Sequence, residues 1–316
     1  MNKLFSVVIP TYNRCHVLRK TLNALFNQTL EPALFEVIVV DDGSTDGTPQ
    51  FVRPLVESAP VPLRYEWWEN SGPGAARNRG IEIARGEHVL FIDDDIIADR
   101  MLLQEHLRYH RLHPGLNEAV LGQVTLAPGV PDTYLNRSHA LYKWEEIADC
   151  HLVNWTHFMT GNISLKRHFL LNARLFFDEE LLNYEDAELG YRAAQHGLRI
   201  FYNKQAIGYH HHDLSREQLM ERARRYGRNL AVLHRKHPEL ASCFGRGSAF
   251  SRRNLPSRIA KDLINPFVRN RLTMPLLYFL AGAVEGCNQA LAALCYRQIS
   301  AYYERLGYRE GQGEMT

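Results

Sequence analysis

The first ninety residues alternate short apolar runs with segments of helical length, and this alternation limits the fold more than any other feature. The apolar runs, rich in β-branched residues, lie at 4–9, 35–40, 63–68 and 88–92. Such runs separated by helices are typical of βαβ units, whose parallel strands are buried on both faces. We therefore predict an α/β fold with a mostly parallel sheet flanked by helices. In sheets of this kind ligands bind at the carboxyl ends of the strands.

The last hundred residues have a different pattern, which predicts a helical C-terminal extension. Residues 215–234 have the composition of a basic helix, and Ser215 and Gln218 have the spacing of a capping box. The apolar run at 274–284 is too short to span a bilayer. We therefore expect two domains, an α/β domain at 1–212 and a basic, helical region at 213–316.

Composition and cysteine usage exclude several protein classes. With 45% hydrophobic and 23% charged residues, the chain is neither disordered nor collagen-like. Its five cysteines form no CxxC pair, which predicts reduced thiols in a cytosolic setting. The sequence also begins directly with strand-like residues and lacks a signal peptide's pattern. We expect a cytoplasmic protein.

The net charge of +2 hides an uneven distribution. Residues 216–271 contain fourteen Lys and Arg against four acidic residues, so the rest of the chain is acidic. Two interpretations stay open. The segment forms either a solvated basic face or a surface that attracts anionic lipid or a diphosphate-lipid acceptor, with 274–284 as an interfacial anchor. No recognised nucleic-acid-binding module accompanies the charge, so nucleic acid is not an expected partner.

Clusters of carboxylates follow two of the predicted strands. Asp41 and Asp42 follow the second run, and Asp93, Asp94 and Asp95 follow the fourth. Adjacent carboxylates repel one another, so such a cluster faces water or a cation. Along an extended backbone Asp93 and Asp95 would share one side. The pattern predicts part of a site for a hard divalent ion such as Mg²⁺ or Mn²⁺.

Several short motifs follow one another along the chain. They are VIPTYNR at 8–14, VVDDGSTDGT at 39–48, GAARNRG at 74–80, FIDDD at 91–95, GN at 161–162, FDE at 177–179 and ED at 185–186. Their order resembles that of the inverting family 2 glycosyltransferases of the GT-A fold, and the DDD run looks like the family's DxD motif. The resemblance covers about two thirds of the chain, residues 4–212.

The resemblance implies roles for individual residues. Asp186 matches the usual catalytic base, and Glu185 would contact the acceptor or orient its loop. Asp95 would bind the divalent metal, Mn²⁺ or Mg²⁺. His210 is a second metal-ligand candidate, on one face with His212 if the strand alternates, and a polar strand end is the alternative interpretation. The residues implied to bind the nucleotide are Pro10, Tyr12, Asp42, Arg77, Asp93 and Asp94.

The function implied by the resemblance is metal-dependent, inverting glycosyl transfer. The donor would be a nucleotide-sugar, with a UDP-sugar preferred, and the acceptor a glycan or lipid-linked hydroxyl. The setting would be cell-surface polysaccharide or glycoconjugate synthesis, in the cytoplasm or at the inner face of the membrane. A sugar nucleotidyltransferase is one alternative, but it would need a Gly-rich loop where this chain has PTYNR. A non-catalytic nucleotide- or glycan-binding protein is another, but it would not need a base.

Overall fold

The computed structural model describes residues 3–137, 147, 151–212, 214–244 and 269–314. The chain divides into two compact units. Unit 1 comprises residues 1–130 and 140–212, and unit 2 comprises residues 131–139 and 213–316. The part of the basic segment at 245–268 lies outside the described residues.

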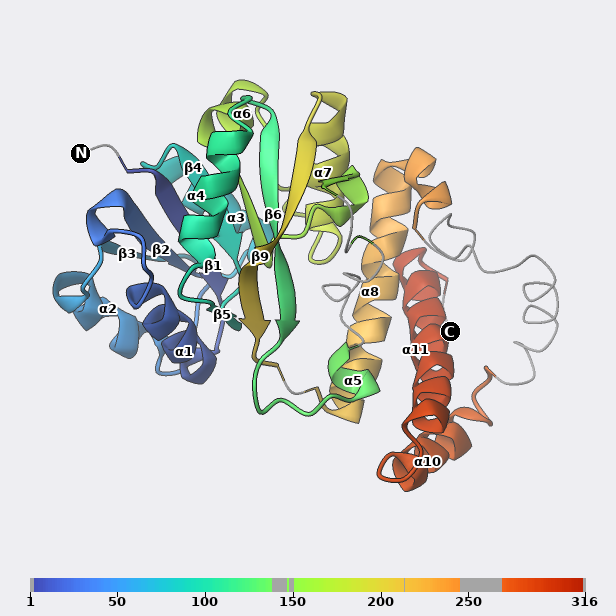
Figure 1. Ribbon diagram of the computed structural model, residues 1–316. Coiled ribbons are helices and arrows are strands. Elements are labelled where there is room, and N and C mark those ends of the chain that lie inside the picture. Colours follow the sequence, from blue (N-terminus) through green and yellow to red (C-terminus); the bar gives the residue numbers. More distant parts are fainter. Residues whose placement is uncertain (1–2, 138–146, 148–150, 213, 245–268, 315–316) are drawn as a thin grey trace. The chain divides into compact units, whose positions relative to one another are not determined.

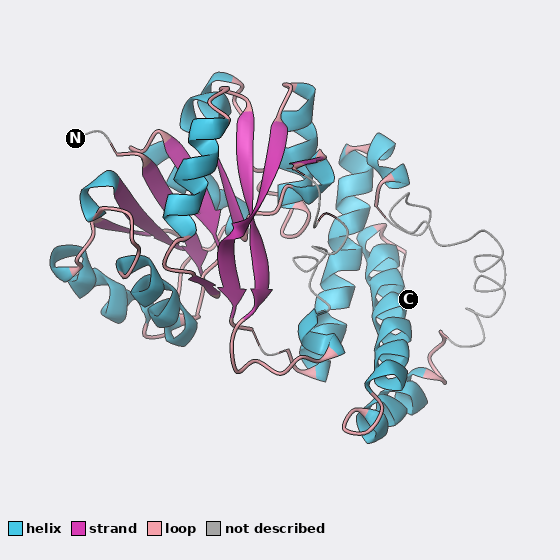
Figure 2. Cartoon of the chain, in the orientation of Figure 1, coloured by secondary structure: helices cyan, strands magenta, loops and turns pink. Residues whose placement is uncertain are grey.

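Unit 1 is built on one curled sheet, which has nine strands among the described residues (Figures 1 and 2). The strand order is β3-β2-β1-β4-β8-β6-β9-β5, and β7 pairs with β9 beside this path. The strands are β1 (Phe5–Thr11), β2 (Phe35–Asp41), β3 (Leu63–Trp67), β4 (His88–Ile92), β5 (Ile96–Ala98), β6 (Glu118–Leu126), β7 (Leu152–Val153), β8 (Asn162–Lys166) and β9 (Arg199–His210).

The α/β prediction is confirmed, and the sheet is parallel where the sequence alternates most clearly. Strands β1 to β4 pair in parallel, as do β6 and β9. The pairs β4–β8, β6–β8, β5–β9 and β7–β9 are antiparallel. Half of the pairings in the described part of the chain are therefore antiparallel, and each of them includes a strand that follows residue 92.

The helices of unit 1 flank this sheet (Figure 2). One of them, α3, approaches β1 unusually closely: a Cβ added at Gly80 would lie 2.2 Å from Cγ1 of Val8. Glycine therefore lets the helix that carries Arg77 pack directly against the central strand. The helices are α1 (Cys15–Phe26), α2 (Thr48–Ser58), α3 (Pro73–Ile83), α4 (Leu102–Leu112), α6 (Arg167–Asn172) and α7 (Glu185–Gln195), with 3-10 turns at Pro32–Leu34 and Trp155–His157.

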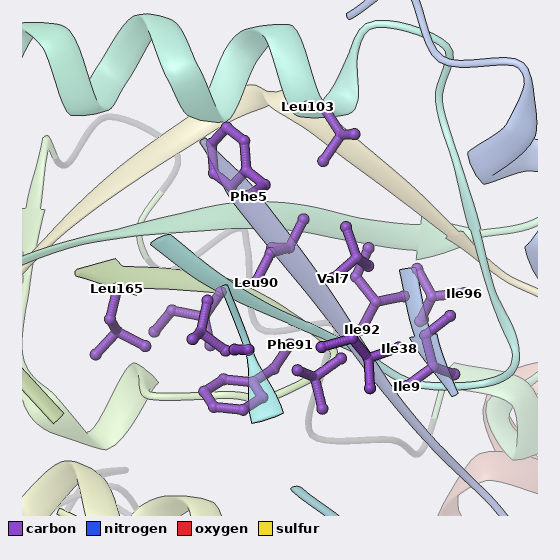
Figure 3. Close-up of a cluster of buried hydrophobic side chains, with 14 of the residues drawn as sticks. Phe5, Val7, Ile9, Ile38, Leu90, Phe91, Ile92, Ile96, Leu103 and Leu165 are labelled. Atoms are coloured by element: carbon purple, nitrogen blue, oxygen red, sulfur yellow. The ribbon is translucent and has the colours of Figure 1, made fainter. Parts of the chain in front are cut away.

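The core of unit 1 forms around the central strands (Figure 3). All residues of β1, β2, β4 and β8 are buried, as expected for strands covered on both faces. Phe5, Ile9 and Phe91 are among the largest fully buried side chains. This packing fixes the strand ends on which the acidic residues lie.

Unit 2 is helical, as predicted. It contains α5 (Tyr134–Arg137), α8 (Arg216–Lys236), a 3-10 turn at Pro238–Ser242, α10 (Met274–Val284) and α11 (Gln289–Gly311). The predicted capping box is present, with Ser215 and Gln218 each bonding the other's backbone N–H. A small core around Tyr296 and Ile299 joins these helices. Among the helices described, none has both the length and the apolar character needed to cross a membrane.

A chain of hydrogen bonds between buried side chains runs beneath α4 in unit 1. The Asn162 amide nitrogen donates to the carbonyl of Ala206 (2.8 Å), so its oxygen accepts from Nε2 of His106 (2.9 Å). Nδ1 of His106 therefore accepts from the Ser164 hydroxyl (2.8 Å), and that hydroxyl accepts from Nε2 of His110 (2.7 Å). Both histidines are neutral in this arrangement, since a protonated ring would leave one donor without an acceptor.

This buried chain predicts that unit 1 loses stability in mild acid. Burial lowers the pKa of His106 to about 4, and burial followed by repulsion from His88 and Lys166 lowers the pKa of His110. The unfolded chain therefore takes up protons first as the pH falls below about 6.5. We expect the free energy of unfolding to fall by up to about 1.4 kcal/mol per pH unit for each histidine.

Denaturant unfolding between pH 7.5 and pH 5 measures this slope. His106→Gln retains a donor for Asn162 but does not titrate, so its slope should be shallower than that of the wild type. The exposed His196→Gln variant is the control and should leave the slope unchanged. Equal slopes for the wild type and His106→Gln would show that the buried imidazole does not govern acid sensitivity.

Candidate active site

The carboxyl ends of β1, β2, β4 and β9 meet at one edge of the sheet (Figure 1). Thr11 at the end of β1 is in register with Asp41 at the end of β2. Strand β8 runs antiparallel to β4, so its first residue, Asn162, pairs with Ile92. The polar segments that follow these strands are therefore neighbours in space although they are far apart in the sequence.

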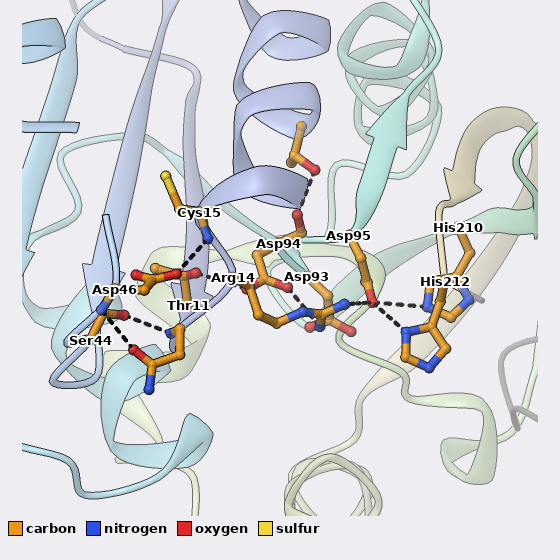
Figure 4. A network of polar contacts seen from close by, with 12 residues as sticks. Thr11, Arg14, Cys15, Ser44, Asp46, Asp93, Asp94, Asp95, His210 and His212 are labelled. Atoms are coloured by element: carbon orange, nitrogen blue, oxygen red, sulfur yellow. Dashed lines mark hydrogen bonds and ion pairs between the residues drawn. The ribbon is translucent and has the colours of Figure 1, made fainter. Parts of the chain in front are cut away.

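The three acidic residues after β4 form the turn into β5 (Figure 4). Asp94 accepts a hydrogen bond from the Thr11 hydroxyl (2.8 Å) and pairs with Nη1 of Arg14 (2.9 Å). Nη2 of the same guanidinium is 2.7 Å from Asp95. The prediction that Asp93 and Asp95 share one side is wrong, because the turn brings Asp94 and Asp95 together on Arg14 and directs Asp93 elsewhere.

Two histidines from the end of β9 converge on the Asp95 carboxylate. Its Oδ2 lies 3.1 Å from Nε2 of His210 and 3.7 Å from Nδ1 of His212. The two rings are nearly parallel, with centroids 5.4 Å apart. The pairing of Ile96 with His210 causes this convergence, because it places the acidic turn directly beside the end of β9. Figure 4 shows both rings facing the carboxylate.

This cluster has the donor set of a divalent-metal site. One ligand atom from each of Asp95, His210 and His212 lies within 4.8 Å of the others. Burial opposes ionisation of Asp95, but His210 and Arg14 outweigh it and hold its pKa below the usual range, so the carboxylate stays charged as a ligand must. Two imidazoles beside one carboxylate suit a first-row transition ion better than Mg²⁺. The residues present therefore fit a metal ion.

Arg77 links two groups of acidic residues that lie far apart in the sequence. Its side chain is buried on α3, and its guanidinium lies 2.7 Å from Asp93 and 2.9 Å from Glu185. Burial opposes the charge, but Asp93 and Glu185 outweigh burial and raise the pKa of Arg77. The acidic turn after β4 and the start of α7 are thus held on one cation.

Glu185 and Asp186 begin α7, where the helix dipole favours negative charge. Glu185 pairs with Arg77, whereas no ion pair joins Asp186 to any residue in the described part of the chain. An oxygen of Asp186 accepts a hydrogen bond from the backbone N–H of its neighbour Ala187 (2.7 Å). Burial, and then repulsion from Glu185, raises the pKa of Asp186. Asp186 therefore takes up a proton at a higher pH than an ordinary carboxyl group does.

The remaining predicted nucleotide residues lie near the ends of β1 and β2. Asp42 is buried and accepts hydrogen bonds from the backbone N–H groups of Ser71 (2.7 Å) and Gly72 (3.0 Å), so it holds the turn that precedes α3. Pro10 is buried within β1, and Tyr12 just beyond is 46% exposed. No hydrogen bond or ion pair joins these three residues to the acidic turn among the residues described.

The structure adds to the site three residues without a predicted role of their own: Thr11, Arg14 and His212. Arg14, in the segment after β1, forms ion pairs with both Asp94 and Asp95. The sequence indicates such a residue only indirectly: three consecutive aspartates at the end of a buried strand need a positive charge nearby. The sequence predicts only that His212 shares a face with His210, whereas in the structure both rings approach Asp95.

Comparisons with known proteins identify the family and the fold of the chain. The sequence profile of glycosyl transferase family 2 matches residues 6–174. Validoxylamine A glucosyltransferase of Streptomyces hygroscopicus subsp. limoneus is 31% identical over 236 residues, which cover 65% of this chain and 51% of the relative. Poly(ribitol-phosphate) β-N-acetylglucosaminyltransferase TarS of Staphylococcus aureus is 27% identical over 205 residues, which cover 62% and 33%. The chain thus spans about half or less of the length of these two curated relatives.

Two solved structures have the same fold. S. aureus TarS 1–349 in complex with UDP superposes with a TM-score of 0.55 at 23% identity, covering 98% of this chain and 92% of that one. The mannosyltransferase PcManGT from Pyrobaculum calidifontis, in complex with GDP-Man and Mn²⁺, gives a TM-score of 0.62 at 20% identity, covering 98% and 87%. The fold is that of the GT-A glycosyltransferases, and the chain belongs to glycosyl transferase family 2.

Proposed function

We propose that this chain is a metal-dependent, inverting glycosyltransferase that moves a sugar from a nucleotide-sugar to an acceptor hydroxyl in the synthesis of a cell-surface glycan. The observation that carries the proposal is the presence of two different kinds of functional group at one edge of the sheet. A carboxylate–imidazole cluster, Asp95 with His210 and His212, suits a cation. A separate carboxylate of raised pKa, Asp186, suits proton abstraction.

The donor side of the proposal rests on the acidic turn. Asp95, His210 and His212 would hold the metal, Mn²⁺ in preference to Mg²⁺, and the ion would stabilise the charge that develops on a nucleoside diphosphate leaving group. Arg14 holds Asp94 and Asp95 in the same turn. TarS has been solved with UDP-GlcNAc and PcManGT with GDP-Man, and for this chain we propose a UDP-sugar.

The rest of the nucleotide site is proposed on Pro10, Tyr12, Asp42, Arg77, Asp93 and Asp94. Asp42 fixes the Ser71–Gly72 backbone, and the exposed Tyr12 ring at the end of β1 offers an apolar face to a base. Arg77 fixes the position of Asp93 on the ribose side. These residues position the donor and take no part in bond breaking.

On the acceptor side, Asp186 takes the proton from the attacking hydroxyl. Glu185 is held by Arg77, so it serves to orient the start of α7. One base opposite the leaving group gives a single displacement: the acceptor oxygen bonds to the anomeric carbon as the bond to the diphosphate breaks. The configuration at that carbon is therefore inverted.

We propose a role for unit 2 in the recognition of the acceptor and in the location of the protein. The relatives include the poly(ribitol-phosphate) transferase TarS and the minor teichoic acid biosynthesis protein GgaA of Bacillus subtilis, which supports a cell-surface glycan acceptor. We propose that this acceptor is presented at the inner face of the membrane, against the basic region at 213–316. We also propose a domain boundary near residue 212. The short segment 131–139 groups with unit 2, although it precedes this boundary in the sequence.

Nuclear magnetic resonance of the reaction products tests the proposed activity. The chain is incubated with Mn²⁺ and a panel of UDP-, dTDP- and GDP-sugars, with and without simple glycan acceptors. We expect one α-linked donor to release its nucleoside diphosphate and the transferred or hydrolysed sugar to appear first as the β anomer. Retention of configuration would overturn the single-displacement mechanism. Pyrophosphate release from a nucleoside triphosphate and a sugar phosphate would instead identify a nucleotidyltransferase.

A further inference from the structure

The outer face of α10 in unit 2 is a continuous apolar stripe. Leu276 is 67% exposed, Phe279 73% and Leu280 37%, and Leu272 just before the helix is 89% exposed. Residues three and four positions apart lie on one face of a helix, so 276, 279, 280 and 283 form one row. The opposite face packs inward through residues such as Ala281, which is fully buried. We call residues 272, 276, 279 and 280 the α10 stripe.

The α10 stripe is unusual for a face left in water. The helix Met274–Val284 contains no charged residue. Single exposed apolar side chains are common, but a contiguous row of large ones marks a surface that binds a partner or a membrane. Eleven residues cannot span a bilayer, so a membrane partner would receive this helix lying in the plane of its surface.

A pocket of about 450 Å³ adjoins the stripe along one flank of α10. Its aromatic lining comes from Tyr278, Tyr302 and Tyr303, with Arg271 beside them. Arg271 is exposed and forms no ion pair with any residue that the structure describes. Tyrosine rings favour the headgroup level of a bilayer, because they are apolar at one end and polar at the other. An unpaired arginine among them suits the phosphate of a lipid headgroup.

We propose that unit 2 binds an anionic phospholipid surface, with the α10 stripe buried at the acyl boundary and the Arg271 pocket holding a lipid phosphate. The charge of the surrounding sequence favours this occupant over a second copy of the chain. Residues 216–271 contain fourteen cations against four acids, which attracts anionic lipid and repels an identical surface. This proposal gives a residue-level basis to the membrane setting in the proposed function, but it does not depend on which sugar is transferred.

Vesicle flotation tests the proposal with the full chain. We compare phosphatidylcholine vesicles with vesicles that also contain phosphatidylglycerol, at low and at high salt. The wild type should float with the anionic vesicles, and salt should weaken but not abolish this binding, because the apolar part is not screened. The double variant Leu276→Ser/Phe279→Ser should lower the partition coefficient at least about tenfold. Arg271→Gln should lower it about fivefold, and only on anionic vesicles.

Matched controls separate a membrane role from folding and from catalysis. Leu182→Ser removes a similarly exposed leucine from unit 1 and should not change vesicle binding. Because the α10 stripe is exposed, its variants should keep the wild-type melting temperature and should keep donor hydrolysis, which needs no membrane. Transferase failure with intact vesicle binding would contradict the proposed function alone.

Two results would overturn the membrane proposal. The first is equal flotation of the wild type and the Leu276→Ser/Phe279→Ser variant. The second is a wild-type dimer, measured by light scattering, that the same double substitution converts to monomer, since a second copy would then cover the stripe. An engineered Phe279→Trp supplies a direct check, because brominated lipid chains should quench its fluorescence when the ring is inserted.

Discussion

Replacing Asp186 with asparagine should abolish glycosyl transfer and leave nucleotide binding intact. The substitution keeps the size of the side chain but removes its ability to accept the proton of the acceptor hydroxyl. General bases contribute about 10²- to 10⁴-fold to such reactions, so we expect kcat to fall by that factor. Asp186 forms no ion pair in the described part of the chain, so its loss should not disturb the acidic turn or the melting temperature.

Neighbouring substitutions and pH identify the base more closely. Glu185→Gln breaks the pair with Arg77 and should weaken catalysis less than Asp186→Asn does. Glu57→Gln, on the exposed side of α2, is the neutral control. Because the pKa of Asp186 is raised, kcat/KM of the wild type should fall as the pH drops through a value above the usual carboxyl range. Wild-type turnover by Asp186→Asn would remove Asp186 from the role of base.

Replacing Asp95 with alanine should remove the metal-dependent part of nucleotide binding. Asp95 supplies the carboxylate at which His210 and His212 converge, and the side chain of alanine offers no ligand atom. A bound ion supplies several kcal/mol of charge stabilisation, so activity should fall about 10³-fold. In calorimetry, the affinity of the variant for nucleoside diphosphate should be the same with and without Mn²⁺.

Two further variants show whether the effect is that of a metal ligand. His212→Ala removes one imidazole and should give a partial loss of Mn²⁺-dependent affinity. Asp99→Asn changes a carboxylate just beyond β5, outside the cluster, and should preserve the Mn²⁺ effect. If Mn²⁺ still strengthens nucleotide binding to Asp95→Ala by the wild-type factor, the ion is bound elsewhere.

The parts of the fold that could be predicted from the sequence are those with local signals. Strands β1 to β4 are buried apolar runs, and the Ser215–Gln218 capping box depends on residues three positions apart. Both follow from short stretches of sequence, and both are present in the structure. The antiparallel strand β8 has no such signal, because its pairing with β4 joins segments about seventy residues apart.

The same distinction between local and long-range signals applies to the residues of the candidate site. The acidic residues and the Glu185–Asp186 pair could be found because they follow or begin predicted elements and match a known motif order. The residues that contact them could not be predicted, because strand pairing between segments far apart in the sequence brings these side chains together. Asp95 meets His210 only through the β5–β9 ladder. Arg14 turns toward Asp94 and Asp95 because the chain after β4 forms a turn and not an extended strand.

The most direct test of the central claim is a thermal-shift panel of UDP, dTDP and GDP, each with and without Mn²⁺. A nucleotide at about 100 times its dissociation constant adds about 2.7 kcal/mol of stability. For a unit of about 200 residues this raises the melting temperature by about 5–10 °C. We predict such a shift for one nucleotide, UDP first, only with Mn²⁺, and its loss in Asp95→Ala. No shift with any nucleotide, or an equal shift in Asp95→Ala, would contradict a metal-dependent nucleotide-sugar site at this edge of the sheet.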